Sequence, residues 1–327
     1  MGKIKIGILG TANIAKKAVI PTLLKLNNYF EIVGVGGRDL QKTKRFCESF
    51  DIAPFESYED VIQNPVIQAI YIPLPNALHF EWVIKALERG LHVMCEKSLG
   101  CNFEEVEIMV SKAREKKVLL MEHFQFRFHK QIEYIQNNIS EIGEVRTIRT
   151  AFGIPPFGDE KNIRYNKKLG GGALLDNGAY PIKIAQIFMT NSINVETCQL
   201  NKEQFEVDIW GNFTIKDSKT GVCLQAAFGF DHIYSCNLEI LGSNGRIYTD
   251  RIYTAPPNHR SKITLEKQIG YDIKKDQVTL SEDDHFKNIW KYFFDIIKAQ
   301  KSFEFEYIHN LNQSKLIDQA ISRSNGK

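Results

Sequence analysis

Two short stretches of this sequence carry side chains able to move protons: Glu96-Lys97, and the run that contains Asp176 and Tyr180. Lys97 follows the apolar segment 92–95, which is typical of a buried strand. Open α/β sheets bind their ligands at the carboxyl ends of strands. In such a low-dielectric cleft, a lysine can donate a proton or stabilise an oxyanion. The alternative is that Glu96 and Lys97 form an ion pair at the surface.

Asp176 and Tyr180 are four residues apart, which places them on one face if the segment is helical. A phenol titrates at about pH 10 and donates its proton more readily beside an ammonium group such as that of Lys97. Residues of these types can serve as a general acid, Tyr180, and as a carboxylate, Asp176, that orients the lysine or binds a substrate hydroxyl. The alternative is an aspartate that caps a helix and a tyrosine of the core.

A turn rich in small residues lies near the start of the chain, where residues 7–15 read Gly-Ile-Leu-Gly-Thr-Ala-Asn-Ile-Ala. Small residues allow backbone N–H groups and a helix N-terminus to face a pyrophosphate. Alanines at positions 12 and 15 stand where the dinucleotide-binding pattern has glycines, so a purely structural turn is the alternative. The residues predicted to contact a dinucleotide here are Gly10, Thr11, Ala12, Asn13 and Ile14.

The end of the next strand indicates which dinucleotide is preferred. The sequence there is Gly36-Gly37-Arg38-Asp39, with no acid at the strand tip to bind ribose hydroxyls. Arg38 is suited to a 2′-phosphate, which favours NADP(H), with NAD(H) possible. In the alternative, Asp39 caps the following helix and Arg38 is merely exposed.

Two further strand ends, at residues 71–79 and 95–98, lie at the same edge of the predicted sheet. The cofactor contacts expected from them are Pro73, Pro75, Asn76, His79, Glu96 and Lys97.

The elements that position these residues follow from hydrophobic periodicity. Strands are predicted over 3–9, 31–35, 67–72, 92–95 and 118–121, with helices over 76–89 and 103–116, a pattern typical of a parallel sheet. After Gly143 longer alternating segments predict an antiparallel sheet over 145–152, 205–215, 222–230, 237–241 and 246–250. Helices are predicted over 286–297 and 311–324. We expect two domains: residues 1–122 bind the dinucleotide, and residues 123–327 form an α+β domain whose last helices could pack back on the first.

The order of these motifs resembles the Gfo/Idh/MocA family (glucose-fructose oxidoreductase, inositol dehydrogenase, rhizopine catabolism). It runs from the glycine turn through Pro75-Asn76-x-x-His79 and Glu96-Lys97 to the run 169–181, so it covers essentially the whole chain. The resemblance implies an α/β fold, with a Rossmann domain and an α+β domain that has an open-faced, mostly antiparallel sheet. The family's usual motif is Glu-Lys-Pro, so Ser98 is a departure that bears on the placement of Lys97.

The resemblance also implies that Lys97, Asp176 and Tyr180 are the catalytic residues of an oxidoreductase that transfers a hydride to or from a sugar carbon. Tyrosine at the last position is similar to the branches of nucleotide-sugar ketoreductases and dihydrodiol dehydrogenases. Arg164 and Tyr165, together with Asp176 and Tyr180, are predicted to bind the substrate, because an arginine binds phosphate and a ring stacks on a sugar. Structural contacts of Arg164 and Tyr165 are the alternative.

Several functions stay open beside a sugar-nucleotide ketoreductase. The substrate could be a free sugar, a polyol or a trans-dihydrodiol. The protein could hold NADP(H) tightly through alternate oxidation and reduction. It could also be a regulatory protein that binds the cofactor without turnover, although retention of all three catalytic residues argues against this.

Composition excludes other classes of protein. The 42 basic and 39 acidic residues are dispersed, so no nucleic-acid partner is expected. There is no apolar run of membrane-spanning length and no secretory signal, which predicts a cytoplasmic protein without a membrane partner. Six scattered cysteines without ligand spacing predict reduced thiols and no metal. By resemblance we expect a homodimer or homotetramer built on the open sheet.

Overall fold

The computed structural model describes residues 2–202 and 205–325. The chain forms two compact units, and each of them is made of two stretches of sequence. The first unit contains Met1–Phe124 and Phe286–Ser314, and the second contains Gln125–His285 and Lys315–Lys327. One helix, α9 (Glu304–Asn325), contributes residues to both units.

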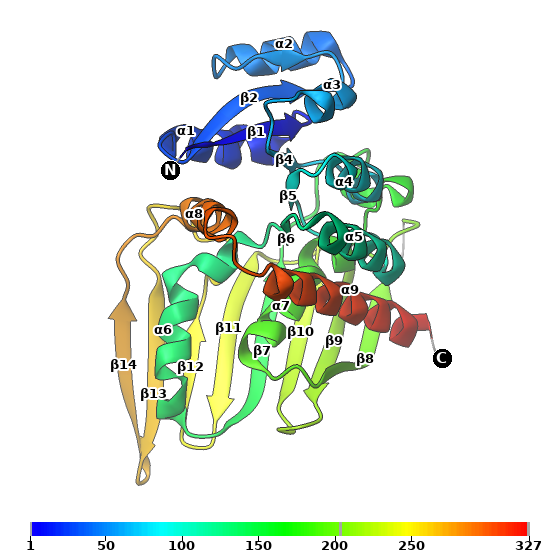
Figure 1. The fold of residues 1–327 in the computed structure, drawn as a ribbon. Coiled ribbons are helices and arrows are strands. Elements are labelled where there is room, and N and C mark those ends of the chain that lie inside the picture. The colour runs from blue at the N-terminus through cyan, green and yellow to red at the C-terminus, as the bar shows by residue number, and fades with distance from the viewer. Residues whose placement is uncertain (1, 203–204, 326–327) are drawn as a thin grey trace. The chain divides into compact units, whose positions relative to one another are not determined.

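The first unit is built on a six-stranded parallel sheet of order β3-β2-β1-β4-β5-β6 (Figure 1). Its strands are β1 (Ile4–Leu9), β2 (Phe30–Gly36), β3 (Pro54–Phe55), β4 (Ala69–Ile72), β5 (His92–Cys95) and β6 (Leu120–Glu122). The order reverses between β1 and β4. Ligands of doubly wound sheets bind at such a switch point, beyond the carboxyl ends of the strands.

Five α-helices lie between these strands in the described chain: α1 (Ile20–Lys25), α2 (Leu40–Glu48), α3 (Tyr58–Gln63), α4 (His79–Glu88) and α5 (Phe103–Lys116). Three of them (α2, α3 and α5) begin at a residue whose side chain caps the first turn. Asn102 caps α5 by accepting the N–H of Glu105 at 2.9 Å, and the helix ends at Lys117 in the left-handed region. The buried side of α4 and α5 completes the apolar core beside β4 and β5.

Two segments from the end of the chain complete the first unit. The α8 helix (His285–Lys298) contributes Trp290, which is fully buried with its ring centroid 5.6 Å from those of Phe30 and Tyr71. In α9, the Tyr307 hydroxyl donates to the carbonyl of Val118, and the Asn310 amide donates to that of Leu120 at 3.0 Å. The edge strand β6 is therefore held by residues that follow it by almost two hundred positions.

The second unit is an eight-stranded sheet of order β14-β13-β12-β11-β7-β10-β9-β8, antiparallel except where β7 pairs with β10 (Figure 1). Its strands are β7 (Val145–Gly153), β8 (Ile193–Asn201), β9 (Trp210–Asp217), β10 (Cys223–Gly229), β11 (Ser235–Gly242), β12 (Gly245–Thr249), β13 (Lys262–Ile269) and β14 (Asp272–Thr279). Both sheets agree with the predicted fold class.

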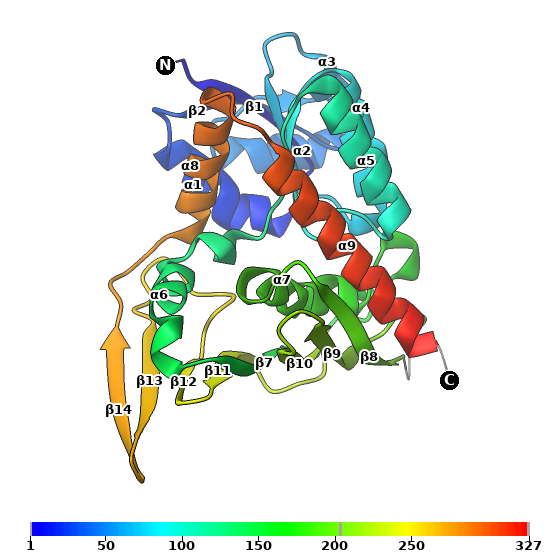
Figure 2. The same cartoon turned by 60° about the horizontal axis from the view of Figure 1, so that its bottom comes forward.

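Helices α6 (Lys130–Asn138) and α7 (Ala179–Phe188) lie over one face of this sheet, as Figure 2 shows. Along β7 the side chains of Ile148, Thr150 and Phe152 are buried, whereas Thr147 and Arg149 alternate with them on the other face. The sheet therefore has a covered face and an open face.

One predicted strand is wrong at its start, since residues 205–209 precede β9 and do not belong to it. Asp208 is the reason: its backbone carbonyl accepts the N–H of Ala173 at 2.8 Å, and its carboxylate accepts the N–H of Leu174 at 2.6 Å. The stretch thus supports the segment that carries Asp176. Periodicity also failed to predict α2, α3, α6, β3, β8, β13 and β14. No helix in the described part of the chain is long and apolar enough to cross a membrane.

Candidate active site

A groove of about 450 Å³ opens at the carboxyl ends of β1, β2 and β4 in the first unit. Six of the predicted cofactor contacts line it: Gly10, Thr11, Ala12, Arg38, Pro73 and Pro75. The other lining residues are Gly37, Asp39, Lys42, Thr43, Tyr58, Leu74 and Leu78. The groove lies at the switch point of the sheet, where a doubly wound fold binds its ligand.

The backbone at the start of the groove has little room for side chains. Gly10 has a φ of 105°, and a Cβ there would lie 2.9 Å from Cδ2 of Leu74. At Gly37 a Cβ would lie 2.1 Å from the Thr43 hydroxyl oxygen. Ala15, which stands where the pattern has its third glycine, is fully buried in the helix that follows. The turn thus keeps glycine at position 10, whereas alanine replaces the pattern's glycine at position 12 in the groove and at position 15 inside the helix.

The end of β2 presents cations to the groove. Arg38 is exposed, whereas Asp39 turns to cap α2 by accepting the N–H of Lys42 at 3.0 Å. The Lys42 ammonium lies 3.8 Å from the Asp39 carboxylate. The predicted alternative for Asp39 is therefore observed. Arg38, which contacts the Tyr58 side chain, and Lys42, which pairs with Asp39, both line the groove. These two cations fit the 2′-phosphate of NADP(H) better than a ribose diol.

Six predicted contacts do not line this groove: Asn13, Ile14, Asn76, His79, Glu96 and Lys97. Asn13 and Ile14 begin the first helix, and Asn76 begins a short 3₁₀ turn. His79 needs a correction as a direct cofactor contact, because its side chain is fully buried and both ring nitrogens face backbone carbonyls. Lys42 and Tyr58 were not predicted, although Lys42 is four residues after Arg38 in the first turn of a capped helix.

Glu96 belongs to a buried hydrogen-bond network. Its carboxylate accepts the Tyr71 hydroxyl and Nδ1–H of His123, each at 2.7 Å. Burial raises the pKa of Glu96, but His123 and Tyr71 outweigh this and hold it below its usual value. Burial beside Glu96 raises the pKa of Tyr71 well above its usual value, so Tyr71 stays a donor. Glu96 thus has the internal partners Tyr71 and His123 in addition to the neighbouring charge of Lys97.

Lys97 follows this network at the end of β5, with its side chain half-buried. The peptide bond between Lys97 and Ser98 is cis. The next residue, Leu99, donates its N–H to the Glu122 carboxylate at 2.9 Å. The segment that carries Lys97 is therefore fixed by hydrogen bonds on both sides.

In the second unit, Asp176 forms an ion pair with Nε of Arg164. Its side chain is 16% exposed, and it lies in a π-helical segment, Leu174–Gly178, directly before α7. Asp176 is thus inside the helical turn and does not cap it. Short π-helical segments often occur at functional sites. The segment is held by Asn177, whose amide donates to the carbonyls of Phe152 and Gly229, both at 3.2 Å.

Tyr180 lies in the first turn of α7, and it is 7% exposed. Its ring packs among those of Phe126, Phe152 and Tyr253, with centroids 5.6, 4.9 and 5.4 Å away. These rings fix the orientation of the phenol. Tyr180 therefore has an aromatic environment while it keeps a small exposed surface.

The predicted substrate contacts Arg164 and Tyr165 have structural partners in their own unit. The Arg164 guanidinium lies 5.0 Å from the centre of the Phe157 ring, besides its pair with Asp176. Tyr165 stacks on Phe205 with centroids 4.2 Å apart, and its hydroxyl accepts the N–H of Phe157 at 3.1 Å. Phe205 thus stacks on one face of the Tyr165 ring, and the contact of Tyr165 with a sugar stays a prediction.

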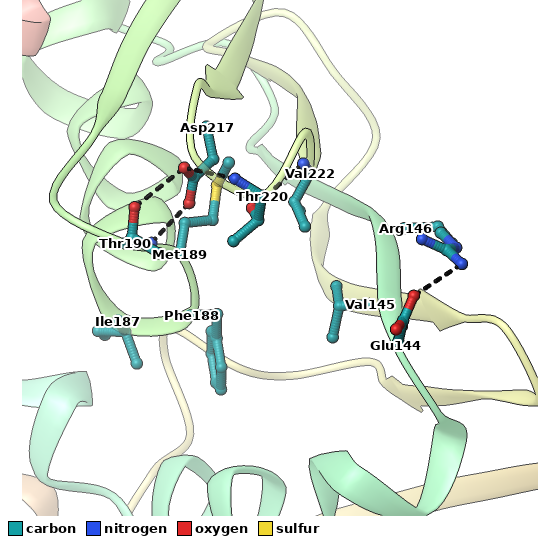
Figure 3. Close-up of a pocket in the computed structure, with 10 residues that line it drawn as sticks. All are labelled: Glu144, Val145, Arg146, Ile187, Phe188, Met189, Thr190, Asp217, Thr220 and Val222. Atoms are coloured by element: carbon teal, nitrogen blue, oxygen red, sulfur yellow. Dashed lines mark hydrogen bonds and ion pairs between the residues drawn. The ribbon is translucent and has the colours of Figure 1, made fainter.

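A second cavity of about 560 Å³ lies in the second unit, away from all predicted site residues (Figure 3). Its polar centre is Asp217, which accepts the N–H of Thr190 at 2.8 Å and the hydroxyl of Thr190 at 2.9 Å. These bonds brace a turn. No group of His, Cys, Asp and Glu residues among the described ones is arranged to hold a metal ion.

Comparison with known proteins identifies close relatives. The chain is 32% identical to dTDP-3,4-didehydro-2,6-dideoxy-alpha-D-glucose 3-reductase of Actinomadura kijaniata, over 96% of this chain and 94% of that one. It is 32% identical to trans-1,2-dihydrobenzene-1,2-diol dehydrogenase of Xenopus laevis, over 78% and 71%. The crystal structure of KijD10, a 3-ketoreductase from Actinomadura kijaniata in complex with NADP and TDP-benzene, aligns with a TM-score of 0.92, 32% identity and 98% coverage of both chains.

Family assignment gives the same answer for both parts of the chain. Residues 4–124 match the family described as "Oxidoreductase family, NAD-binding Rossmann fold", and residues 137–248 match the "GFO/IDH/MocA C-terminal domain". The resemblance and the fold class expected from the sequence are confirmed. The chain belongs to the Gfo/Idh/MocA family of oxidoreductases.

Proposed function

We propose that this protein is an NADP(H)-dependent ketoreductase that reduces a keto group of a nucleotide-linked deoxysugar. The observation that carries the proposal is the identity of 32% over 96% of the chain with a dTDP-sugar 3-reductase. Three further reductases of the same name, from Saccharopolyspora and Streptomyces species, are 32–34% identical over 82–90% of the chain.

The groove of the first unit supports NADP(H) as the cofactor. Its tight turn at Gly10 leaves backbone space for a pyrophosphate, and Arg38 with Lys42 supplies positive charge at the end of β2. When bound, NADPH would supply the hydride. Outside the groove, Asn13, Ile14 and Asn76 are still proposed to contact the cofactor. Glu96 is proposed to act indirectly, by holding the segment that carries Lys97 in place.

The residues of the chain would supply the proton and stabilise charge. As the ketone carbon gains the hydride, the C=O π bond breaks and negative charge develops on oxygen. We assign the proton donor to Tyr180: its phenol O–H bond breaks, the proton passes to that oxygen, and the tyrosinate regains a proton from water. The Lys97 ammonium would stabilise the developing alkoxide and the tyrosinate. Asp176, which pairs with Arg164, is proposed to accept a hydrogen bond from a sugar hydroxyl.

The direct test is to mix the protein with NADPH and dTDP-3,4-didehydro-2,6-dideoxy-α-D-glucose and to follow NADPH absorbance. We expect one NADPH oxidised per keto group reduced, with dTDP as a competitive inhibitor. No oxidation, together with NADP reduction by D-xylose or by trans-1,2-dihydrobenzene-1,2-diol, would instead assign a dehydrogenase. Relatives of both kinds are similar to this chain, at 29% and 32% identity.

Location and assembly are also proposals. All six cysteines are free, which supports the reducing cytoplasm. We propose a homodimer or homotetramer built on the open sheet face. That face carries polar pairs such as Thr197 with Thr214 at 2.7 Å and Arg246 with Glu266 at 2.6 Å. Light scattering after gel filtration would give the mass of the assembly, and a monomer would reject this part.

A further inference from the structure

His79 lies at the first position of α4, and its side chain is fully buried. Its ring Nδ1 is 2.8 Å from the carbonyl oxygen of Ser98, and Nε2 is 2.8 Å from that of Leu74. All these residues belong to the first unit. A single ring therefore bridges two segments that are far apart in the sequence.

One of the two segments lines the cofactor groove, and the other adjoins the proposed catalytic lysine. Leu74 lies between Pro73 and Pro75, and all three line the dinucleotide groove. Ser98 directly follows Lys97 at the end of β5. The Nε2 contact thus holds a wall of the groove, and the Nδ1 contact holds the backbone beside Lys97.

The hydrogen bonds on the other side of Lys97 show why the Ser98 carbonyl matters. Glu96 is fixed by Tyr71 and His123, so the segment before Lys97 cannot shift easily. On the far side, the Ser98 carbonyl lies 2.8 Å from Nδ1 of His79. Removing that contact weakens the support of the segment after Lys97, where the hydrogen bond from the Leu99 N–H to the Glu122 carboxylate remains.

We propose that His79 is a positioning residue with two separable roles: through Nε2 it shapes the cofactor groove, and through Nδ1 it fixes Lys97 for catalysis. The inference rests on the proposed function of Lys97. A carbonyl only accepts, so each contact is a hydrogen bond when that ring nitrogen carries a proton. Both bonds form at once only in the imidazolium. Burial outweighs the Ser98 and Leu74 carbonyls and the Glu96 carboxylate and lowers the pKa of His79, so the neutral ring donates from one nitrogen at a time.

Two conservative variants separate the roles, because each keeps one donor. The amide of His79→Asn can occupy the place of Nδ1, and that of His79→Gln can occupy the place of Nε2. We expect His79→Gln to lower kcat about 10-fold while the Kd for NADPH stays within about 3-fold of the wild type. We expect His79→Asn to raise the Kd for NADPH about 10-fold with most of kcat retained.

The matched control is His92→Gln at the opposite end of β5. There Nδ1 of His92 accepts the N–H of Leu119 at 2.9 Å, so the residue also joins two strands but lies away from the groove. We expect this control to lower the melting temperature without changing kcat or the Kd for NADPH. If both His79 variants lose kcat and affinity together, in proportion to their loss of melting temperature, the role is only structural and the proposal is overturned.

The design also separates this inference from the proposed function. The titration of His79→Asn with NADPH requires no turnover, so it tests the role of His79 in the groove independently of activity. If the wild type reduces no dTDP-sugar, that result rejects the proposed function but not the role of His79 in the groove. If neither variant folds, wild-type protein labelled with ¹⁵N at histidine decides the matter. A ring N–H of His79 protected from exchange is expected, and its absence would overturn the bridge.

Discussion

Arg38 gives the sharpest prediction about the cofactor, because NADPH and NADH differ only in the 2′-phosphate. Replacing Arg38 with Ala removes an exposed cation from the groove at the end of β2 while Asp39 keeps its capping bond to α2. The fold should therefore be unchanged, and the loss should fall on the phosphate.

The magnitude follows from charge. A phosphate monoester near pH 7 carries about two negative charges, and each pair of unit charges about 4 Å apart in water contributes about 1 kcal/mol. The loss on Arg38→Ala is then about 2 kcal/mol, or about 30-fold in the Kd for NADPH. Lys42 lies 3.8 Å from Asp39, which already neutralises part of its charge, so Lys42→Ala should cost only about 5-fold.

The assay is a fluorescence titration of wild type, Arg38→Ala and Lys42→Ala with NADPH and with NADH at two salt concentrations. NADH affinity should change less than about 3-fold, and the loss in NADPH affinity should shrink as salt rises. Arg38→Lys separates charge from the guanidinium fork, since it keeps only the former. Equal losses for the two dinucleotides in Arg38→Ala would refute the assignment of the 2′-phosphate.

The remaining predictions concern catalysis, the turn and stability. Lys97→Ala and Tyr180→Phe should each lower kcat by about 10²- to 10⁴-fold with nearly unchanged NADPH affinity, and normal turnover in both would reject their roles. Gly10→Ala should weaken NADPH binding and lower the melting temperature, because a Cβ there meets Leu74 at 2.9 Å with φ at 105°; a variant with wild-type affinity contradicts this. Asp217 is fully buried, and burial raises the pKa of its carboxyl. The N–H of Thr190 and other donors outweigh this and lower the pKa to about 2. The ionised carboxylate therefore stabilises the fold fully above about pH 4, and this contribution is lost as the pH falls through 2. Asp217→Asn should therefore cost about 2 kcal/mol at pH 7 in urea unfolding and progressively less below pH 4, and a pH-independent loss would count against this origin.

The first unit was predictable where sequence pattern and burial coincide. Segment 92–95 is a strand and 103–116 is a helix, as periodicity predicted, because continuous apolar residues and an asparagine cap determine them locally. The helices α2 and α3 are short, and β3 has only two residues, so their patterns are too brief to stand out. The strand β14 is almost entirely exposed, and without an alternating apolar face it gives no periodic signal.

Candidate site residues could be predicted from the sequence where the backbone conformation requires a particular residue type. They were harder to predict where the role of a residue depends on which side chains and carbonyls it contacts. Gly10 and Arg38 followed from the turn and from the strand tip. His79 and Tyr165 contact carbonyls and rings from distant segments, and a single sequence does not show such partners. For the same reason Asp208 was assigned to a strand, although its contacts with residues 173–174 make it a support for the Asp176 segment.

The return of the chain end to β6 has a consequence for biosynthesis. When residue 124 leaves the ribosome, the sheet of the first unit has all six strands, but Trp290, Tyr307 and Asn310 do not yet exist. At about 5–20 residues per second, the ribosome needs roughly 10 to 40 seconds to supply them. During that interval the apolar side of Phe30 and Tyr71 and the carbonyls at 118 and 120 stay uncovered. The nascent chain therefore presents a surface that chaperones can bind until its last helices arrive.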